Sequence, residues 1–185
     1  NNALKKAYAS ENVTIDKKTD VKVKIDNLSA FKDLANSLID KYAVPTEATE
    51  TFKSEPEKAE KFLVPTALEA DGAKEAKVEA TENGYKVTIT LVSETVDYKT
   101  APKYNTQASL PLTGIAELAA QNNVTVKSSS FNYSGTILTA EIDKDGNILS
   151  LNHTMPLKLS AKVRYGLMNI EGSGSGKYTL DATFT

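Results

Sequence analysis

The sequence predicts an α+β fold, in which a curved, mostly antiparallel sheet, half-barrel-like in shape, packs on two or three helices. The clearest observation is an alternation of apolar and polar residues from Leu157 to Leu167. A period of two over that length is typical of a β-strand that buries one face and exposes the other. A second alternating run follows, with Tyr178, Leu180, Ala182 and Phe184 at every second position. The turns between such runs are too short for parallel crossovers, so we expect antiparallel pairing.

The length and composition fit a single α+β domain. The chain has 185 residues, of which 40% are hydrophobic, and a net charge of −2. Its two halves, about residues 1–100 and 101–185, share a loose order of helix, hairpin and further strand, which could reflect duplication or chance. The longest apolar run falls well short of the ~20 residues that a membrane-spanning helix needs.

The use of cysteine and arginine narrows the classes of function. Cysteine is absent, which excludes disulfides, thiolate nucleophiles and zinc–sulfur sites and favours an exported bacterial protein. Arg164 is the only arginine and tryptophan is absent, so we expect no nucleic-acid partner. The chain begins at Asn1 without a signal-peptide pattern, and we expect a targeting segment ahead of it.

The first part of the chain predicts helix, strand and helix. A short helix is indicated by Ala3, Leu4, Ala7 and Tyr8. Alternation predicts a strand from about Val13 to Asp26. The strongest helix pattern follows, with one apolar face made of Phe31, Leu34, Ala35, Leu38, Ile39 and Tyr42. Ser29 is its N-cap and Pro45 ends it. We expect this helix to cover the apolar face of the sheet.

The middle of the chain has the weakest pattern, from Thr46 to Ala76. Ser54 has capping-box spacing for a short helix at Pro56–Leu63. Asn83-Gly84 lies between two alternating runs and predicts a hairpin with a type I′ turn. The polar segment Ser93–Ser109 is expected to form an extended edge.

From Thr113 the sequence predicts one more helix and then strand after strand. Thr113 caps a short helix that carries Ile115, Leu118 and Ala119 and that Asn122-Asn123 would end. The expected strands are Val124–Ser130, Tyr133–Asp143, Asn147–His153, Met155–Ile170 and Lys177–Thr185. Asp145-Gly146 is expected to be a tight turn, and Glu171–Lys177 a flexible hairpin loop.

Three local patterns resemble sites of chemistry, and each has a simpler structural interpretation. His153 is the only histidine and has no nucleophile elbow nearby, so we expect a surface or strand-end residue. Asp143–Asn147 resembles half of a calcium loop but lacks the remaining ligands. Glu171–Lys177 resembles a phosphate loop, yet a strand follows it instead of a helix. We therefore expect no catalytic, metal-binding or cofactor-binding residues, no cofactor and no enzymatic activity.

Two surface patterns are expected to be incidental. Asn-X-Ser/Thr triplets begin at Asn12, Asn27, Asn123, Asn132 and Asn152, as chance allows in this composition. Lys158, Lys162 and Arg164 form a basic stripe, which is typical of a solvated or edge-protecting strand face. Among 24 acidic residues, no carboxylate pair stands out as a hydrolase site.

The apolar face of the sheet is the remaining candidate for function. If helices cover it fully, it is only core, which is the favoured interpretation. If the sheet stays an open half-barrel, part of that face becomes a groove for a lipid or another hydrophobic molecule. The wall of such a groove would contain Tyr165, Leu167, Tyr178 and Phe184.

Both ends of the chain resemble a known family. The helix Ala3–Tyr8 and the strand Lys17–Asp26, together with the C-terminal strands from Ile137 onward, are similar to exported bacterial lipoproteins of the lipoprotein-carrier superfamily. The resemblance covers about half of the chain, and Thr46–Ser109 has no counterpart. It implies an open antiparallel half-barrel around helices, which in some members shields acyl chains, and it implies no catalytic residues.

These observations lead to two hypotheses of function. The first is a non-enzymatic domain, secreted or at the bacterial cell surface, which binds a lipid or other hydrophobic small molecule under the sheet. Its only membrane attachment would be a lipid anchor on a cysteine ahead of Asn1. The alternative is a cell-surface interaction or scaffolding module for an unknown protein partner.

Overall fold

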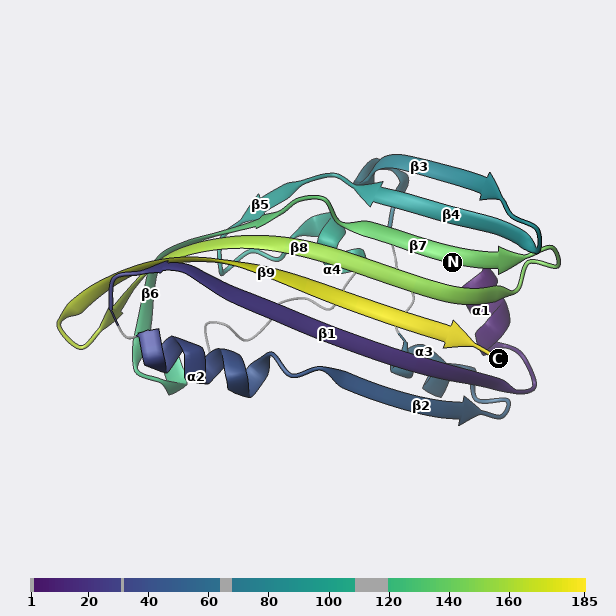
Figure 1. Cartoon of the computed structure of the whole chain (residues 1–185), viewed down its shortest axis with the longest axis horizontal. Helices are drawn as coiled ribbons and strands as arrows, with labels where there is room; N and C mark the ends of the chain where they lie inside the picture. The colour runs from purple at the N-terminus through teal and green to yellow at the C-terminus, as the bar shows by residue number, and fades with distance from the viewer. Residues whose placement is uncertain (1, 31, 64–67, 109–119) are drawn as a thin grey trace.

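The computed structural model describes residues 2–30, 32–63, 68–108 and 120–185. They form an open, curved antiparallel sheet with a few short helices, and the sheet is not closed into a barrel (Figure 1). The strands are β1 (Val13–Leu28), β2 (Thr46–Phe52), β3 (Ala73–Ala80), β4 (Gly84–Leu91), β5 (Glu94–Val96), β6 (Val124–Tyr133), β7 (Ile137–Asp143), β8 (Ile148–Tyr165) and β9 (Met168–Phe184). The predicted curved, mostly antiparallel sheet is confirmed.

Three long strands, β1, β9 and β8, run side by side along the molecule, and shorter strands pair with them near either end (Figure 1). The strand order is β2-β1-β9-β8-β7-β4-β3, while β6 pairs with β8 and β5 with β6. Along one side of β8, Ile148–Thr154 pair with β7 and Leu157–Tyr165 pair with β6. Pro156 lies where the partner changes, so a residue without a backbone N–H is tolerated in this long inner strand.

The turn between β8 and β9 is not where the sequence predicts it. Tyr165 pairs with Met168, which leaves Gly166-Leu167 as a two-residue turn. Gly166 has φ +59°, typical of the first central position of a type II′ hairpin turn. The expected hairpin loop at Glu171–Lys177 is therefore wrong, because these residues pair with β1 and β8 inside β9. A run of glycine and serine is typical of turns, but here it continues a strand.

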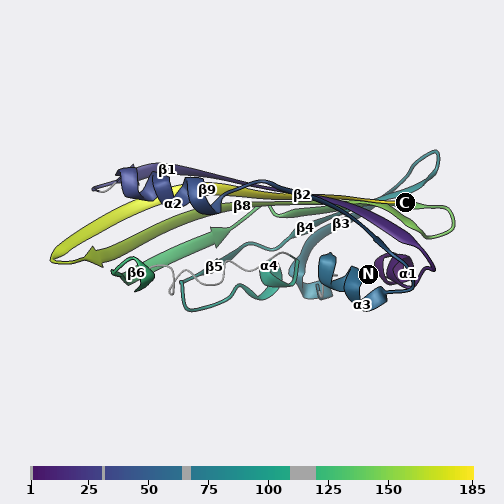
Figure 2. The ribbon, with the colours of Figure 1, turned by 90° about the horizontal axis from the view of Figure 1, so that it is seen from below.

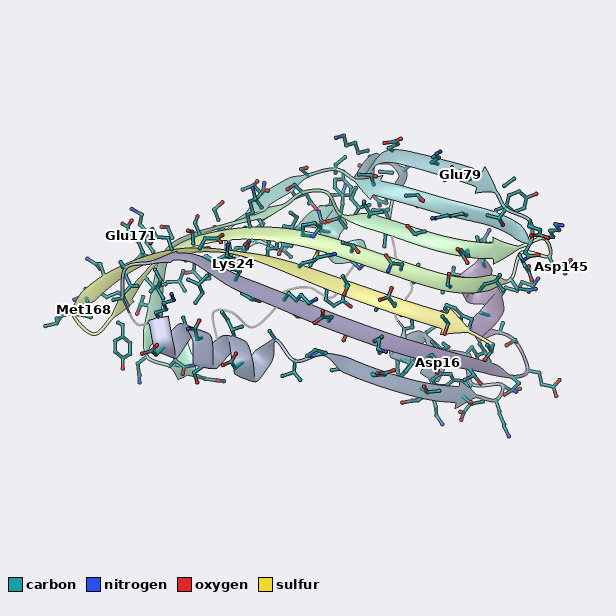
Figure 3. All side chains as sticks on the ribbon, in the orientation of Figure 1. Asp16, Lys24, Glu79, Asp145, Met168 and Glu171 are labelled. Atoms are coloured by element: carbon teal, nitrogen blue, oxygen red, sulfur yellow. The ribbon has the colours of Figure 1, made fainter. Side chains whose placement is uncertain are left out.

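The long strands have one apolar and one polar face, as the alternation predicts. On the apolar face, register places Ile15 beside Phe184 and Leu180 beside His153. The opposite face carries hydroxyl, amide and charged side chains, among them Asp16, Lys18, Lys22, Asn152, Thr154, Lys158, Thr179, Asp181 and Thr183. Positively and negatively charged side chains project from this face along the sheet, for example Lys24 and Asp16 (Figure 3).

Two separate hydrophobic clusters pack on the apolar face. The first lies at the end where helices α1 (Asn2–Tyr8) and α3 (Pro56–Phe62) approach the sheet (Figure 2). Its buried residues are Leu4, Tyr8, Val13, Ile15, Phe52, Ala59, Leu63, Ile148, Ala182 and Phe184. The second contains Phe131, Tyr133, Met155 and Leu157, with Val96, Tyr98, Leu159 and Tyr178 against it. We call these the α1–α3 cluster and the β6–β8 cluster.

Helix α2 (Lys32–Tyr42) forms as predicted but does not lie across the apolar face. Figures 1 and 2 place it alongside β1, in line with β2 and near the level of the sheet. The cause is the chain path, because β1 ends at Leu28 whereas β2 begins opposite Thr19 at Thr46. The segment between them must return along the edge of β1, and α2 is part of that return. The expectation that this helix shelters the sheet is therefore wrong.

The short helices and turns follow the sequence in part. α1 and α3 form where they are expected, but α3 has no side-chain cap and Glu55 is its N-cap, so the Ser54 capping box is wrong. The β3–β4 hairpin is confirmed, yet Ala80 pairs with Tyr85, so its loop is longer than a type I′ turn. The helix expected after Thr113 lies mostly outside the described residues.

Candidate functional site

The apolar face changes character along its length. Beneath α1 and α3 its side chains are almost fully buried. Toward the β8–β9 turn, Ile170 is still buried opposite Val163, but the same face also carries half-buried or exposed aliphatic side chains, which we call the apolar strip: Val23, Ile25, Leu159, Ala161 and Val163. Val23 is 36% exposed. Apolar surface is therefore left in contact with water at this end of the sheet.

Three glycines of β9 lie between the two sides of the apolar strip. Gly176, Gly174 and Gly172 pair with Leu157, Leu159 and Ala161 of β8, and with Val23, Ile25 and Leu28 of β1. The middle strand consequently presents backbone where its neighbours present side chains. The backbone is also closely approached, since a Cβ added at Gly174 would lie 2.8 Å from the Lys24 carbonyl oxygen. Any larger residue at Gly174 would push β9 away from β1.

His153 lies between the two clusters and is the one buried polar side chain without a hydrogen-bond partner among the described residues. It is 3% exposed, its Nε2 atom is unpartnered, and its ring makes an edge contact with Tyr178 at a centroid distance of 5.6 Å. Burial lowers the pKa of His153 to about 4, so the ring is neutral at pH 7. The expectation of a surface or strand-end histidine is wrong, because His153 pairs within β8 and faces inward.

The four residues expected to form a ligand wall lie along the whole apolar face. Phe184 is buried in the α1–α3 cluster and Tyr178 packs against the β6–β8 cluster. Tyr165 and Leu167 lie at the β8–β9 turn, where Leu167 is 90% exposed. The structure brings Tyr165 and Leu167 together and places Tyr178 and Phe184 elsewhere. The sequence missed the aliphatic residues of β1, because only pairing reveals that β1 is next to β9.

The basic stripe of β8 lies on the polar face. Lys162 forms an ion pair with Glu171 of β9 at 2.7 Å, and both side chains are well exposed. The Arg164 Nε–H donates to the Gly166 carbonyl oxygen at 3.0 Å and so supports the turn. Exposed pairs of this kind contribute little to stability.

A network of polar side chains holds the first turn of helix α4 (Lys103–Ala108). One Glu94 carboxylate oxygen accepts hydrogen bonds from the backbone N–H groups of Tyr104 and Asn105 and from the Asn105 amide. Burial pushes the pKa of Glu94 upward, but these donors outweigh it and hold the pKa below its usual value. Asn105 in turn accepts a hydrogen bond from buried Thr136 at 2.7 Å. The network ties α4 to β5 and to the β6–β7 loop, a structural role.

The turn at Asp145-Gly146 is confirmed. Asp143 Oδ1 accepts hydrogen bonds from the backbone N–H groups of Asp145 and Asn147, and Oδ2 accepts one from the Asn147 amide. These donors hold the pKa of Asp143 below its usual value. The side chain that resembles a calcium ligand therefore closes a hairpin.

Neither a metal centre nor a spanning helix is found in the part of the chain that the structure describes. No three or more His, Asp and Glu side chains of that part gather as metal ligands, and none of its helices is long and apolar enough to cross a membrane. The chain matches no family model, no curated protein and no solved structure. The resemblance to lipoprotein carriers stays a prediction.

Proposed function

We propose that this protein is an exported, non-enzymatic binding domain that takes a lipid or another hydrophobic molecule along the apolar strip. The observation that supports the proposal most directly is the incomplete cover of that strip, whose aliphatic side chains flank three glycines of β9. An apolar chain laid there would contact β1 and β8 on either side and the β9 backbone beneath it.

The physical driving force is the removal of apolar surface from water. Burial contributes about 25 cal/mol per Å² of apolar surface, or roughly 1.5–3 kcal/mol for a large aliphatic side chain that becomes fully buried. Val23, Ile25, Leu159 and Val163 are each only partly buried in the protein. A ligand that covers them would gain part of this free energy at several positions together.

An interaction through strand addition is less well supported. The outer edge strand β3 is lined by exposed charged residues, namely Lys74, Glu75, Lys77 and Glu79. Lys77 and Glu79 form an exposed ion pair at 2.8 Å. Charged edges of this kind oppose pairing with another strand, so hydrophobic ligand binding is the function we favour.

Binding of palmitate, measured by native mass spectrometry and titration, tests the proposal. We expect Val163→Asn to weaken binding roughly tenfold, because one partly buried aliphatic contact is replaced by an amide. Ser160→Asn introduces the same side chain on the polar face of β8 and should leave the affinity unchanged. The proposal fails if the unaltered protein binds neither palmitate nor any component of a bacterial lipid extract.

A further inference from the structure

The β8–β9 hairpin ends in an exposed apolar tip. Leu167 is 90% exposed and Met168 is 48% exposed, and Tyr165 stands beside them at 37%. Figures 1 and 2 show the hairpin turn at one extreme of the molecule, beyond the neighbouring strands, and Figure 3 labels Met168 there. No described exposed hydrophobic residue exceeds Leu167 in exposure. We call Tyr165, Gly166, Leu167 and Met168 the hairpin tip.

The hairpin tip is held in shape by its own backbone. A two-residue turn with Gly166 at φ +59° is among the shortest connections of a hairpin, and Tyr165 and Met168, the residues on either side of it, are paired. Arg164 adds a hydrogen bond from its Nε to the Gly166 carbonyl oxygen. Because the turn is ordered before any contact is made, presenting these side chains to an apolar phase costs little conformational entropy.

Positive charge accompanies the hairpin tip. Near the turn, from Ala161 to Gly172, the hairpin has two basic residues, Lys162 and Arg164, and one acidic residue, although the whole chain has a net charge of −2. The acidic residue, Glu171, is already paired with Lys162. Arg164 lies two residues from the turn, on the polar face of β8. Apolar side chains at the extreme end, with cationic side chains behind them, match the acyl region and anionic headgroups of a bilayer.

We propose that the hairpin tip inserts into the surface of a membrane that contains anionic lipids. Leu167 and Met168 enter the acyl region, Tyr165 lies at the level of the headgroups, and Arg164 contacts lipid phosphates. The contact is peripheral, since only a turn enters the bilayer. This inference needs no ligand on the apolar strip, so it stands or falls independently of the proposed function.

The absence of tryptophan gives a direct test, because a single introduced tryptophan reports on one position. We use Leu167→Trp, with Val78→Trp as the matched control, since Val78 is 64% exposed on β3. With vesicles of phosphatidylcholine and phosphatidylglycerol, the emission of the first variant should shift to shorter wavelength and become protected from aqueous iodide. The control should not change. An unshifted emission from the Leu167→Trp variant would overturn the proposal, including where a protein extract shifts it instead.

Co-sedimentation with the same vesicles measures the contribution of the native side chains. Leu167→Asn combined with Met168→Asn should reduce binding by tenfold or more, because two apolar side chains leave the bilayer. Arg164→Gln should reduce binding to anionic vesicles roughly fivefold and leave binding to pure phosphatidylcholine unchanged. Lys86→Gln removes an exposed charge from β4 and serves as its control. Equal binding by the double variant and the unaltered protein contradicts insertion.

Discussion

At the scale of single residues, His153 places a polar ring atom, Nε2, in the interior of the sheet. A lone histidine in a polar stretch, Asn152-His153-Thr154, is typical of a strand end. The register of β8 instead directs the side chain inward between the two clusters. Among the described residues, Nε2 has no hydrogen-bond partner. A buried polar atom without a partner costs about 1–3 kcal/mol, so His153 weakens the fold it belongs to.

Protonation of His153 should make stability depend on pH. The pKa of the histidine is about 4 in the folded protein and about 6.5 in the unfolded chain. Between these pH values the unfolded chain binds the proton and the folded protein does not. The contribution of neutral His153 to the free energy of unfolding is therefore fully present above pH 6.5 and is lost as the pH falls toward 4. We expect this residue to contribute a loss of about 3 kcal/mol.

Urea unfolding of the unaltered protein and of His153→Gln measures that loss. The glutamine keeps a polar side chain but does not titrate, so the difference in unfolding free energy between the two proteins should change by a few kcal/mol between pH 7 and pH 4. The carboxylates titrate equally in the two proteins, so their effect cancels in the difference between the two unfolding free energies. A difference that is the same at both pH values would contradict a lowered pKa, because it would mean that His153 binds protons equally in the folded and unfolded chain.

Steric contact at the β9 glycines gives a second prediction at this scale. A Cβ at Gly174 would lie 2.8 Å from the Lys24 carbonyl oxygen, whereas a Cβ at Gly176 would lie 3.4 Å from that of Lys22. Gly174→Ala should therefore destabilise the protein by about 1–3 kcal/mol and Gly176→Ala by clearly less. Thermal unfolding of both variants provides the comparison, and equal melting temperatures would contradict the close approach of β1 and β9.

At the scale of elements, pattern length decides what the sequence can predict. The long alternations of β1, β8 and β9 identify strands, since only a strand keeps a period of two for so many residues. β2 escapes prediction because Thr46–Phe52 has only Ala48 and Phe52 as apolar residues. The Gly-Ser run of β9 is taken for a turn because its apolar neighbours belong to other strands.

The position of a helix is harder to predict than its presence. The apolar periodicity of α2 indicates that one face of the helix is shielded from water. It does not indicate which surface of the protein that face packs against. Only the pairing of Thr46 with Thr19 shows that the chain must return along the edge of β1. The same limit applies to the candidate site, since the apolar strip combines residues of β1 and β8 more than 130 positions apart in the sequence.

Helices α3 and α2 should respond differently to an introduced aspartate. Ala59 of α3 is fully buried in the α1–α3 cluster, whereas Ala35 of α2 is only partly buried. Ala59→Asp should destabilise the protein by several kcal/mol, because an unpaired carboxylate would lie in an apolar core. Ala35→Asp should cost less than about 1 kcal/mol. Urea unfolding measures both, and a large loss for Ala35→Asp would show that α2 does cover core surface.

At the scale of the whole molecule, the apolar face is closely packed beneath α1 and α3 and only partly covered toward the β8–β9 turn. The α1–α3 cluster and the β6–β8 cluster stabilise the body, while the apolar strip and the hairpin tip remain accessible at the β8–β9 turn. The two features lie next to each other on the apolar side of the β8–β9 hairpin, so that, with the hairpin tip inserted as proposed, a hydrophobic molecule leaving the bilayer would reach the apolar strip next.

Photo-crosslinking with a palmitate analogue that carries a diazirine tests this account most directly, with the modified peptides mapped by mass spectrometry. We predict labelling at Val23 and Ile25 of β1 and at Leu159, Ala161 and Val163 of β8, competed by unlabelled palmitate. Labelling that falls instead on polar-face side chains, such as Lys18, Lys22 and Asp181, or that does not respond to competitor, would contradict binding on the apolar strip.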